Sequence, residues 1–186
     1  MYKLCKTDQS AARQRQLEQK LLQAMQESNY EDISISDLCN RMQIPRKAFY
    51  RYFSSKDGAL FALLDHTMLE FYTEGLRGTG GDALGDLKLF FLFWYQHQDL
   101  LEALERSHLS GMMIERATIL AHKEKLMPRQ IANLPPELQS IAMSFAVCGL
   151  MSMVLQWHKQ KYRISAEEIT QAAISMLTNP LVNTNR

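Results

Sequence analysis

The stretch that decides the fold is SISDLCNRMQIPRKAFYRYFSSK, residues 34–56. It reads as two short helices joined by a tight turn, and a new helix starts near Lys56. Four side chains of the second helix are cationic or aromatic and are left to point away from its packed face: Arg46, Lys47, Tyr50 and Arg51. A short helix of this kind, braced by another helix, has the geometry needed to enter a DNA major groove. The stretch therefore indicates DNA binding and argues against an enzyme.

The residues before this stretch supply the remaining helix of a small head. Leu17 and Leu21 recur at helical spacing, so a first helix over about residues 9–26 has one buried stripe. Ser34 is placed to cap the second helix, and the carboxylate of Asp37 lies in its first turn. These signals predict a three-helix head of the helix-turn-helix type.

The rest of the chain also has helical period, and no strand alternation is sustained. Helices are expected over about residues 56–76, 82–96, 109–125 and 136–161, with a short one from Asp99 and a last one capped by Ser165. Gly75, Gly78, Gly80, Gly81 and Gly85 predict a flexible connection. The expected fold is all-α. A helix-turn-helix DNA-binding domain occupies residues 1–54, and a larger helical ligand-binding and dimerisation domain occupies residues 55–186.

Charge and cysteine content narrow the class of protein. Residues 1–60 hold ten Lys and Arg against seven Asp and Glu, whereas the remainder holds eleven against thirteen. This asymmetry fits a basic DNA-binding head on a body with another task. Cys5, Cys39 and Cys148 follow no metal-ligand or disulfide spacing. We interpret them as reduced thiols and expect no metal site.

Two classes of protein are not expected from the motifs. The chain has no run of about eighteen apolar residues and no apolar signal-peptide core near Met1, so we expect a cytoplasmic protein without a membrane-spanning helix. It also lacks a nucleophile elbow, a phosphate-binding glycine loop followed by Lys-Ser/Thr, and an HExxH motif. We therefore expect no catalytic residues and no cofactor.

Residues 10–64 resemble the tetracycline-repressor (TetR) family of bacterial transcriptional regulators. The family pattern is an aromatic residue, Tyr, any residue, His or Tyr, Phe, and a Lys a few positions later. The matching residues here are Phe49, Tyr50, Tyr52, Phe53 and Lys56. Two glycines usual in the family are replaced, one by Asn29 and one by Gln43. If Gln43 takes a positive φ, the expected cost is about 1 kcal/mol.

The resemblance implies a set of DNA contacts. Ser34, Tyr50 and Lys56 would contact phosphates, and Arg46 and Lys47 would reach base edges. General chemistry agrees, because a helix N-terminus and a lysine both bind phosphate and an arginine can bridge two acceptors of guanine. The alternative for the cations Arg46, Lys47 and Arg51 is a solvated basic face on a helix that only packs.

The body offers candidates for an effector pocket. Aromatic and methionine side chains supply adaptable apolar surface, and a few polar groups could anchor a ligand. The candidate lining is Phe90, Trp94, His97, His108, Met112, Glu115 and Met151. The effector expected from this lining is a small apolar or aromatic molecule. The alternative is that these residues are ordinary core or surface.

Residues 141–155 are apolar on almost all sides, and such a helix must be covered all round. A second subunit is the economical cover, and two helices from each subunit would form a four-helix interface. The residues expected at this interface are Phe145, Cys148, Gly149, Ser152, Leu155, Ala172 and Met176. A central helix buried within one subunit is the alternative.

The function expected for the chain follows from the family resemblance. It implies a ligand-responsive regulator, most often a repressor, that binds double-stranded DNA at a near-palindromic operator as a homodimer. Two alternatives stay open: a helical adaptor whose head binds protein, and a DNA-binding regulator without a small-molecule effector.

Overall fold

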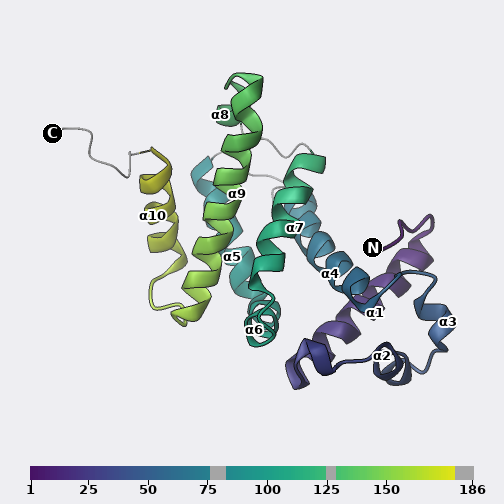
Figure 1. The fold of residues 1–186 in the computed structure, drawn as a ribbon. Helices are drawn as coiled ribbons and strands as arrows, with labels where there is room; N and C mark the ends of the chain where they lie inside the picture. The colour runs from purple at the N-terminus through teal and green to yellow at the C-terminus, as the bar shows by residue number, and fades with distance from the viewer. Residues whose placement is uncertain (76–82, 125–128, 179–186) are drawn as a thin grey trace. The chain divides into compact units, whose positions relative to one another are not determined.

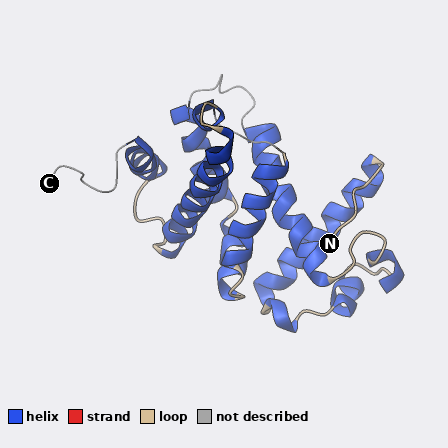
Figure 2. Ribbon diagram, turned by 45° about the horizontal axis from the view of Figure 1, so that its top comes forward, coloured by secondary structure: helices blue, strands red, loops and turns tan. Residues whose placement is uncertain are grey.

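The computed structural model describes residues 1–75, 83–124 and 129–178, and within these ranges it is helical with no named strand (Figures 1 and 2). The α-helices are α1 (Asp8–Glu27), α2 (Ile35–Arg41), α3 (Arg46–Phe49), α4 (Lys56–Glu70), α5 (Ala83–Gln96), α6 (Gln98–Arg106), α7 (Ser110–Lys123), α8 (Arg129–Ala132), α9 (Pro136–Lys159) and α10 (Ala166–Thr178). A 3₁₀ turn, η1 (Tyr30–Asp32), follows α1, and a π-helical turn, η2 (Phe71–Gly75), follows α4. The all-α fold class is confirmed.

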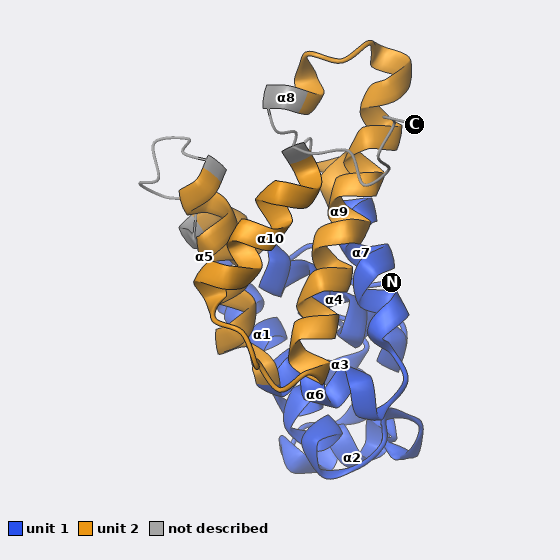
Figure 3. Ribbon diagram, turned by 90° about the vertical axis from the view of Figure 1, so that its left-hand side faces the viewer, with its two compact units in different colours: residues 1–68, 99–120 blue, residues 69–98, 121–186 orange. Residues whose placement is uncertain are grey.

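The chain forms two compact units (Figure 3). The first contains residues 1–68 and 99–120, so α6 and most of α7 belong with the N-terminal helices. The second contains residues 69–98 and 121–186. The two compact units therefore have other bounds than the two domains expected from the sequence, residues 1–54 and 55–186. That division into a DNA-binding and a regulatory domain stays a proposal.

The helices of the head begin where the sequence provides caps. Thr7 accepts a hydrogen bond from the Ser10 amide at the start of α1. At the start of α2, Ser34 and Asp37 form a reciprocal capping box. Side chains such as Leu17 and Leu21 are buried on the inner face of α1, as their spacing predicts.

Among the described residues, three helices end in the same way. In α2, the Ile44 amide donates to the Cys39 carbonyl and the Gln43 amide donates to the Asn40 carbonyl. This pair of bonds is the Schellman motif, which places one residue in the left-handed region. Gln43, His108 and Lys161 occupy that position after α2, α6 and α9, with φ values of 52°, 57° and 53°.

An aromatic cluster organises the second unit, where α5 packs against α9 and α10. Phe91 and Trp94 of α5 are fully buried, and Phe91 meets Trp157 of α9 edge to face, with 6.0 Å between ring centres. Tyr95, by contrast, is 44% exposed. The consecutive aromatic residues of α5 therefore do not share one buried face, as their spacing predicts.

Several sequence expectations need adjustment. The helix expected over residues 56–76 changes to a π-helical turn at Phe71. Asn29, which stands where the family usually has a glycine, has φ −64° and ψ 145°, an extended conformation that requires no glycine. The C-cap residue of α1 is Ser28. Of the expected glycine-rich connection, residues 78–81 lie outside the described residues.

Helix α9 corrects the expectation that no helix could span a membrane. Its 24 residues are long and apolar enough to do so by length and composition, and only a small share of the relevant window is buried within this chain. The sequence count missed it because isolated serine and glutamine residues interrupt the apolar run without making the whole segment polar. The same feature gives α9 an exposed apolar face.

Candidate DNA-binding surface

The recognition segment, residues 46–51, separates a buried face from an exposed one. Phe49 of α3 is fully buried and packs on Phe53, with 5.1 Å between ring centres. Arg46, Lys47 and Arg51 are exposed, and so is much of Tyr50. Because this aromatic plug, formed by Phe49 and Phe53, fixes one side of the short helix, the cationic groups face solvent.

Two exposed side chains of this segment are linked to each other. An Nη2 of Arg46 lies 3.3 Å from the hydroxyl oxygen of Tyr50, one helical turn away. The contact holds a guanidinium and a phenol side by side on the outer face. Such a pair can reach a base edge and a neighbouring phosphate from the same helix.

Ser34 lies at the N-terminus of α2 and is exposed. Its hydroxyl donates to an Asp37 carboxylate oxygen at 2.6 Å and accepts from the Asp37 amide at 3.1 Å. These bonds lower the pKa of Asp37. Hydrogen bonding to the charged form thus keeps a carboxylate beside a position that the sequence assigned to a phosphate contact.

The ammonium of Lys56, which the sequence assigned to a phosphate, already donates hydrogen bonds to backbone carbonyl oxygens within the protein. Its Nζ donates to the carbonyl oxygens of Tyr30 at 2.5 Å and Ile33 at 2.8 Å, with Glu31 at 3.4 Å, and it lies 4.2 Å from the centre of the Tyr30 ring. In this structure the ammonium therefore joins the start of α4 to η1. A role on phosphate requires part of this set of bonds to be exchanged.

Gln43 takes the left-handed conformation that the missing family glycine would favour, with φ 52°. The turn keeps both hydrogen bonds of the Schellman motif. The expected cost of about 1 kcal/mol therefore applies at this position, and the turn is nonetheless formed.

A buried polar network in the first unit was missed in the sequence. Asp65 of α4 is 2% exposed and accepts from Arg116 Nε at 2.9 Å and from Arg116 Nη2 at 2.5 Å. The hydroxyl of Tyr2 donates to the same carboxylate at 2.8 Å. Burial and the bond to Asp65 raise the pKa of Tyr2, so its phenol stays a donor. The available signal was an Asp-His pair inside an otherwise apolar stretch of α4.

The neighbouring pair Glu18 and His66 belongs to the same region. Glu18 is 1% exposed, and His66 Nδ1 lies 2.9 Å and 3.0 Å from its two carboxylate oxygens. Burial raises the pKa of Glu18 from 4.5 to about 8, although Arg15 at 3.5 Å lowers it. A shared proton between the two groups satisfies this contact.

The end of α6 is tied to the head within the first unit. The Ser107 hydroxyl accepts from the Tyr30 amide at 3.1 Å, and Arg106 Nη1 donates to the Gln26 carbonyl at 2.5 Å. The Tyr30 hydroxyl donates to Asp57 at 2.6 Å, and burial raises its pKa. These bonds place η1 at a junction between α1, α4 and α6.

The residues predicted to line an effector pocket fall in both units. Phe90, Trp94, His97 and Met151 belong to the second unit, whereas His108, Met112 and Glu115 belong to the first. Phe90 and Trp94 pack on each other, and His97 stacks on Phe93 while its Nδ1 contacts the Phe93 carbonyl oxygen at 2.8 Å. His108 is exposed and occupies a helix-ending position, which gives it a structural role. The pocket as a whole stays a prediction.

The residues predicted for the dimer interface all lie in the second unit. Phe145, Gly149, Ser152 and Met176 are exposed, Cys148 and Ala172 are half-buried, and Leu155 is buried within its own chain. Leu155 therefore lies outside the exposed face of α9 to which Phe145 belongs. The interface stays a prediction, with its exposed members defining one face.

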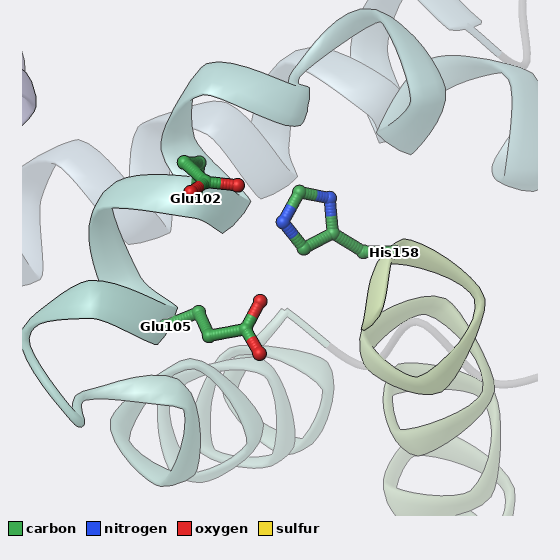
Figure 4. Close-up of side chains that lie close together, drawn as sticks. All are labelled: Glu102, Glu105 and His158. Carbon is green, nitrogen blue, oxygen red and sulfur yellow. The ribbon is translucent and has the colours of Figure 1, made fainter. Parts of the chain in front are cut away.

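Glu102 and Glu105 project from α6, and His158 projects from α9 (Figure 4). The two glutamates belong to the first unit and the histidine to the second. Among the described residues, no single unit contains all three side chains. Glu102, Glu105 and His158 therefore do not form a metal site within one unit.

Known proteins are similar to this chain in the sequence of its head and in its fold. Residues 21–64 match the family described as "Bacterial regulatory proteins, tetR family". No curated protein matches the chain. Among solved structures, the chain is similar to the dihydroxyacetone kinase operon activator DhaS, with TM-score 0.57 and 15% identity over 88% of this chain and 93% of that one. It is also similar to a transcriptional regulator of the TetR/AcrR family from Thermobifida fusca YX-ER1, with TM-score 0.47 and 18% identity over 92% of this chain and 100% of that one.

The family match spans the end of α1, the helix-turn-helix and the start of α4, which are the elements that carry the recognition segment. The similarity to DhaS concerns the fold alone, and it covers most of the chain, beyond the residues of the family match. Residues 21–64 therefore match the N-terminal DNA-binding domain of bacterial tetR-family regulators, and this match supports a role in DNA-binding regulation of transcription.

Proposed function

We propose that this protein is a cytoplasmic, ligand-responsive repressor that binds a near-palindromic operator as a homodimer. The observation that carries the proposal is the recognition segment, where Arg46, Lys47 and Arg51 are exposed over a fully buried Phe49. A helix fixed from behind by an aromatic plug, with its cations outward, is suited to direct readout in the major groove.

The contacts within this surface divide by chemistry. Arg46 can donate to both acceptors of a guanine, and Lys47 can add a donor beside it. Tyr50 and Arg51, on the following half-turn, are suited to phosphate oxygens, which position the helix without reading sequence. Ser34 and Lys56 contribute to phosphate binding if their present bonds to Asp37 and to the η1 carbonyls are partly exchanged.

The homodimer is supported by the exposed face of α9. Leu138, Ile141 and Phe145 follow each other at helical spacing, and the last two are each 64% exposed. Gly149 and Ser152, which are small residues, continue the same face, and a Cβ at Gly149 would meet no atom within 4 Å. A second copy of α9 can pack closely on such a face by two-fold symmetry.

A dimer would set the distance between two recognition helices. Two recognition helices held about one DNA turn apart, roughly 34 Å, read the two halves of a palindrome. An effector of apolar or aromatic character would bind the body and favour a state in which α4 tilts and the heads separate. It can do so only as far as it binds that state better than the DNA-bound one.

The test is binding of the purified protein to DNA from its own upstream region, at two salt concentrations and with excess competitor. We expect tight, competitor-resistant binding at a near-palindrome. Replacing Lys47 or Tyr50 with alanine should abolish this binding and leave the oligomeric state unchanged. Weak binding that disappears with salt would leave only a basic helical surface and would favour an adaptor.

Matched controls come from the second unit, which lies outside the proposed surface. Lys159→Ala removes an exposed lysine as Lys47→Ala does, and Arg163→Ala removes an exposed arginine of the same unit. Both control variants should bind the operator as the parent does. Equal losses in the controls and in the head variants would mean that general charge, and not the recognition segment, binds the DNA.

A further inference from the structure

The first residues of the chain pair with the segment that follows α3. The Lys3 amide donates to the Tyr52 carbonyl at 2.9 Å, and the Ser54 amide donates to the Met1 carbonyl at 3.1 Å, around an antiparallel bridge between Tyr2 and Phe53. Main-chain bonds on both sides of the bridge fix the register of the two segments. We call residues 1–5 the strap. It precedes the residues that match the family, which begin at 21.

Side chains hold the strap on its other edge. Gln14 of α1 is 3% exposed, and its amide nitrogen donates to the Lys3 carbonyl at 3.1 Å. The Cys5 thiol donates to the amide oxygen of Gln14 at 3.0 Å. A single buried side chain therefore contacts two positions of the strap, which leaves it little freedom to slide.

The strap lies close against helix α4 at Gly58. A Cβ on Gly58 would lie 2.5 Å from the Met1 carbonyl oxygen and 3.0 Å from its carbonyl carbon, and both are backbone atoms. A side chain at this position would therefore displace the strap. Close approach, and not backbone conformation, explains the glycine here.

The strap contacts the recognition segment directly and α7 only through Asp65 of α4. The Lys3 ammonium donates to the Tyr50 carbonyl at 3.2 Å, within the surface assigned to DNA. The Tyr2 hydroxyl donates to Asp65, whose carboxylate also receives both bonds from Arg116 of α7. One carboxylate thus links α7 to the strap, and the strap is paired with residues 52–54.

We propose that the strap positions the recognition segment for sequence-specific DNA binding, and that Tyr2 is a positioning residue whose anchor, Asp65, is shared with Arg116. The inference rests on the proposed DNA-binding function. When the strap detaches, residues 52–54 lose their main-chain partners and Tyr50 and Arg51 lose their fixed orientation. A change in α7 that withdraws Arg116 would loosen the Tyr2 anchor and weaken operator binding.

The test uses two variants of the full chain that detach the strap by different means. Tyr2→Phe removes one hydroxyl, and Gly58→Ala adds a Cβ against the Met1 carbonyl. Their matched controls are Tyr95→Phe and Gly111→Ala. Tyr95 lies in α5 of the second unit, and a Cβ at Gly111 would meet no atom within 4 Å. Leu4→Ala, at an 80% exposed position of the strap, is a third control.

Three quantities are measured: affinity for the operator, affinity for competitor DNA, and hydrogen exchange of the Lys3 and Ser54 amides. We expect Tyr2→Phe and Gly58→Ala to weaken operator binding about tenfold, to change competitor binding less than about twofold, and to speed exchange at both amides. A merely structural role would lower both affinities together. The three controls should behave as the parent.

The failures are distinguishable. If the strap variants exchange faster but bind the operator as the parent does, the strap does not position the recognition segment. If the parent itself shows no specific binding, the proposed function fails as well. The link to α7 is tested with Arg116→Met. The combined Tyr2→Phe and Arg116→Met variant should lose less operator affinity than the product of the two single losses, whereas independent losses would exclude the shared anchor.

Discussion

The ammonium of Lys56 lies 2.5 Å from the carbonyl oxygen of Tyr30 and 4.2 Å from the centre of its ring. The lysine that the family pattern assigns to DNA is therefore also a structural tie between η1 and α4. Hydrogen bonds from a charged group to carbonyl oxygens contribute more to stability than neutral ones. A stability measurement and a DNA-binding measurement can separate the two roles.

Lys56→Met should lower the free energy of unfolding by about 1–3 kcal/mol, because it leaves the Tyr30 and Ile33 carbonyls without this partner. Lys47→Met, at an exposed position of α3, should change it by less than about 0.5 kcal/mol while weakening DNA binding. Urea denaturation of both variants checks this. Equal stability of the two variants would contradict the structural tie.

Gln43→Gly should stabilise the protein by a net amount of about 0.5 kcal/mol. The substitution relieves a side chain at φ 52°, and this gain exceeds the added entropy of the unfolded chain. Asn29→Gly is the matched control at the other position where the family usually has glycine. Because Asn29 is extended at φ −64°, it should gain nothing and lose a few tenths of a kcal/mol. Gains of the same sign at both positions in thermal unfolding would count against this explanation.

Glu18 should make stability depend on pH. Its pKa is raised from 4.5 to about 8 in the folded state, so the folded protein holds the proton more tightly than the unfolded chain. The stabilisation is complete below pH 4.5, declines as the pH rises and is lost above about pH 8, a decline on the order of 5 kcal/mol. Glu18→Gln should flatten this decline in denaturation series from pH 5 to 9. An unchanged slope in the variant would assign the decline to other groups.

Phe145→Glu should convert the proposed dimer to a monomer, because it places a charge in the centre of the exposed face of α9. Sedimentation velocity in detergent-free buffer checks the oligomeric state. Operator affinity should fall roughly 100-fold, since two linked half-sites bind more tightly than one. Leu4→Glu, also at an exposed apolar position, should leave the oligomeric state unchanged. A parent that is monomeric, or that requires detergent, would contradict α9 as a dimer interface.

The local features of the head were predictable from the sequence. The capping box at Ser34, the buried Phe49 and the exposed cations at Arg46 and Lys47 all follow from residues within one or two helical turns of each other. Helical period and capping depend on short-range contacts, so a single sequence contains the information. The positive φ of Gln43 was raised as a condition by the family resemblance, and only the structure shows that Gln43 adopts it.

The tertiary structure alone decided what each polar side chain contacts. Lys56 reaches carbonyls 23 to 26 residues away, Asp65 meets Arg116 across 51 residues, and Tyr2 reaches Asp65 across 63. It also decided that Leu155 lies inside while Phe145 lies outside, although both belong to one apolar run. Helical period determines which residues share a face. Which face is buried, and which charges meet there, depends on chain segments far away in the sequence, because burial and ion pairing are made by packing between helices.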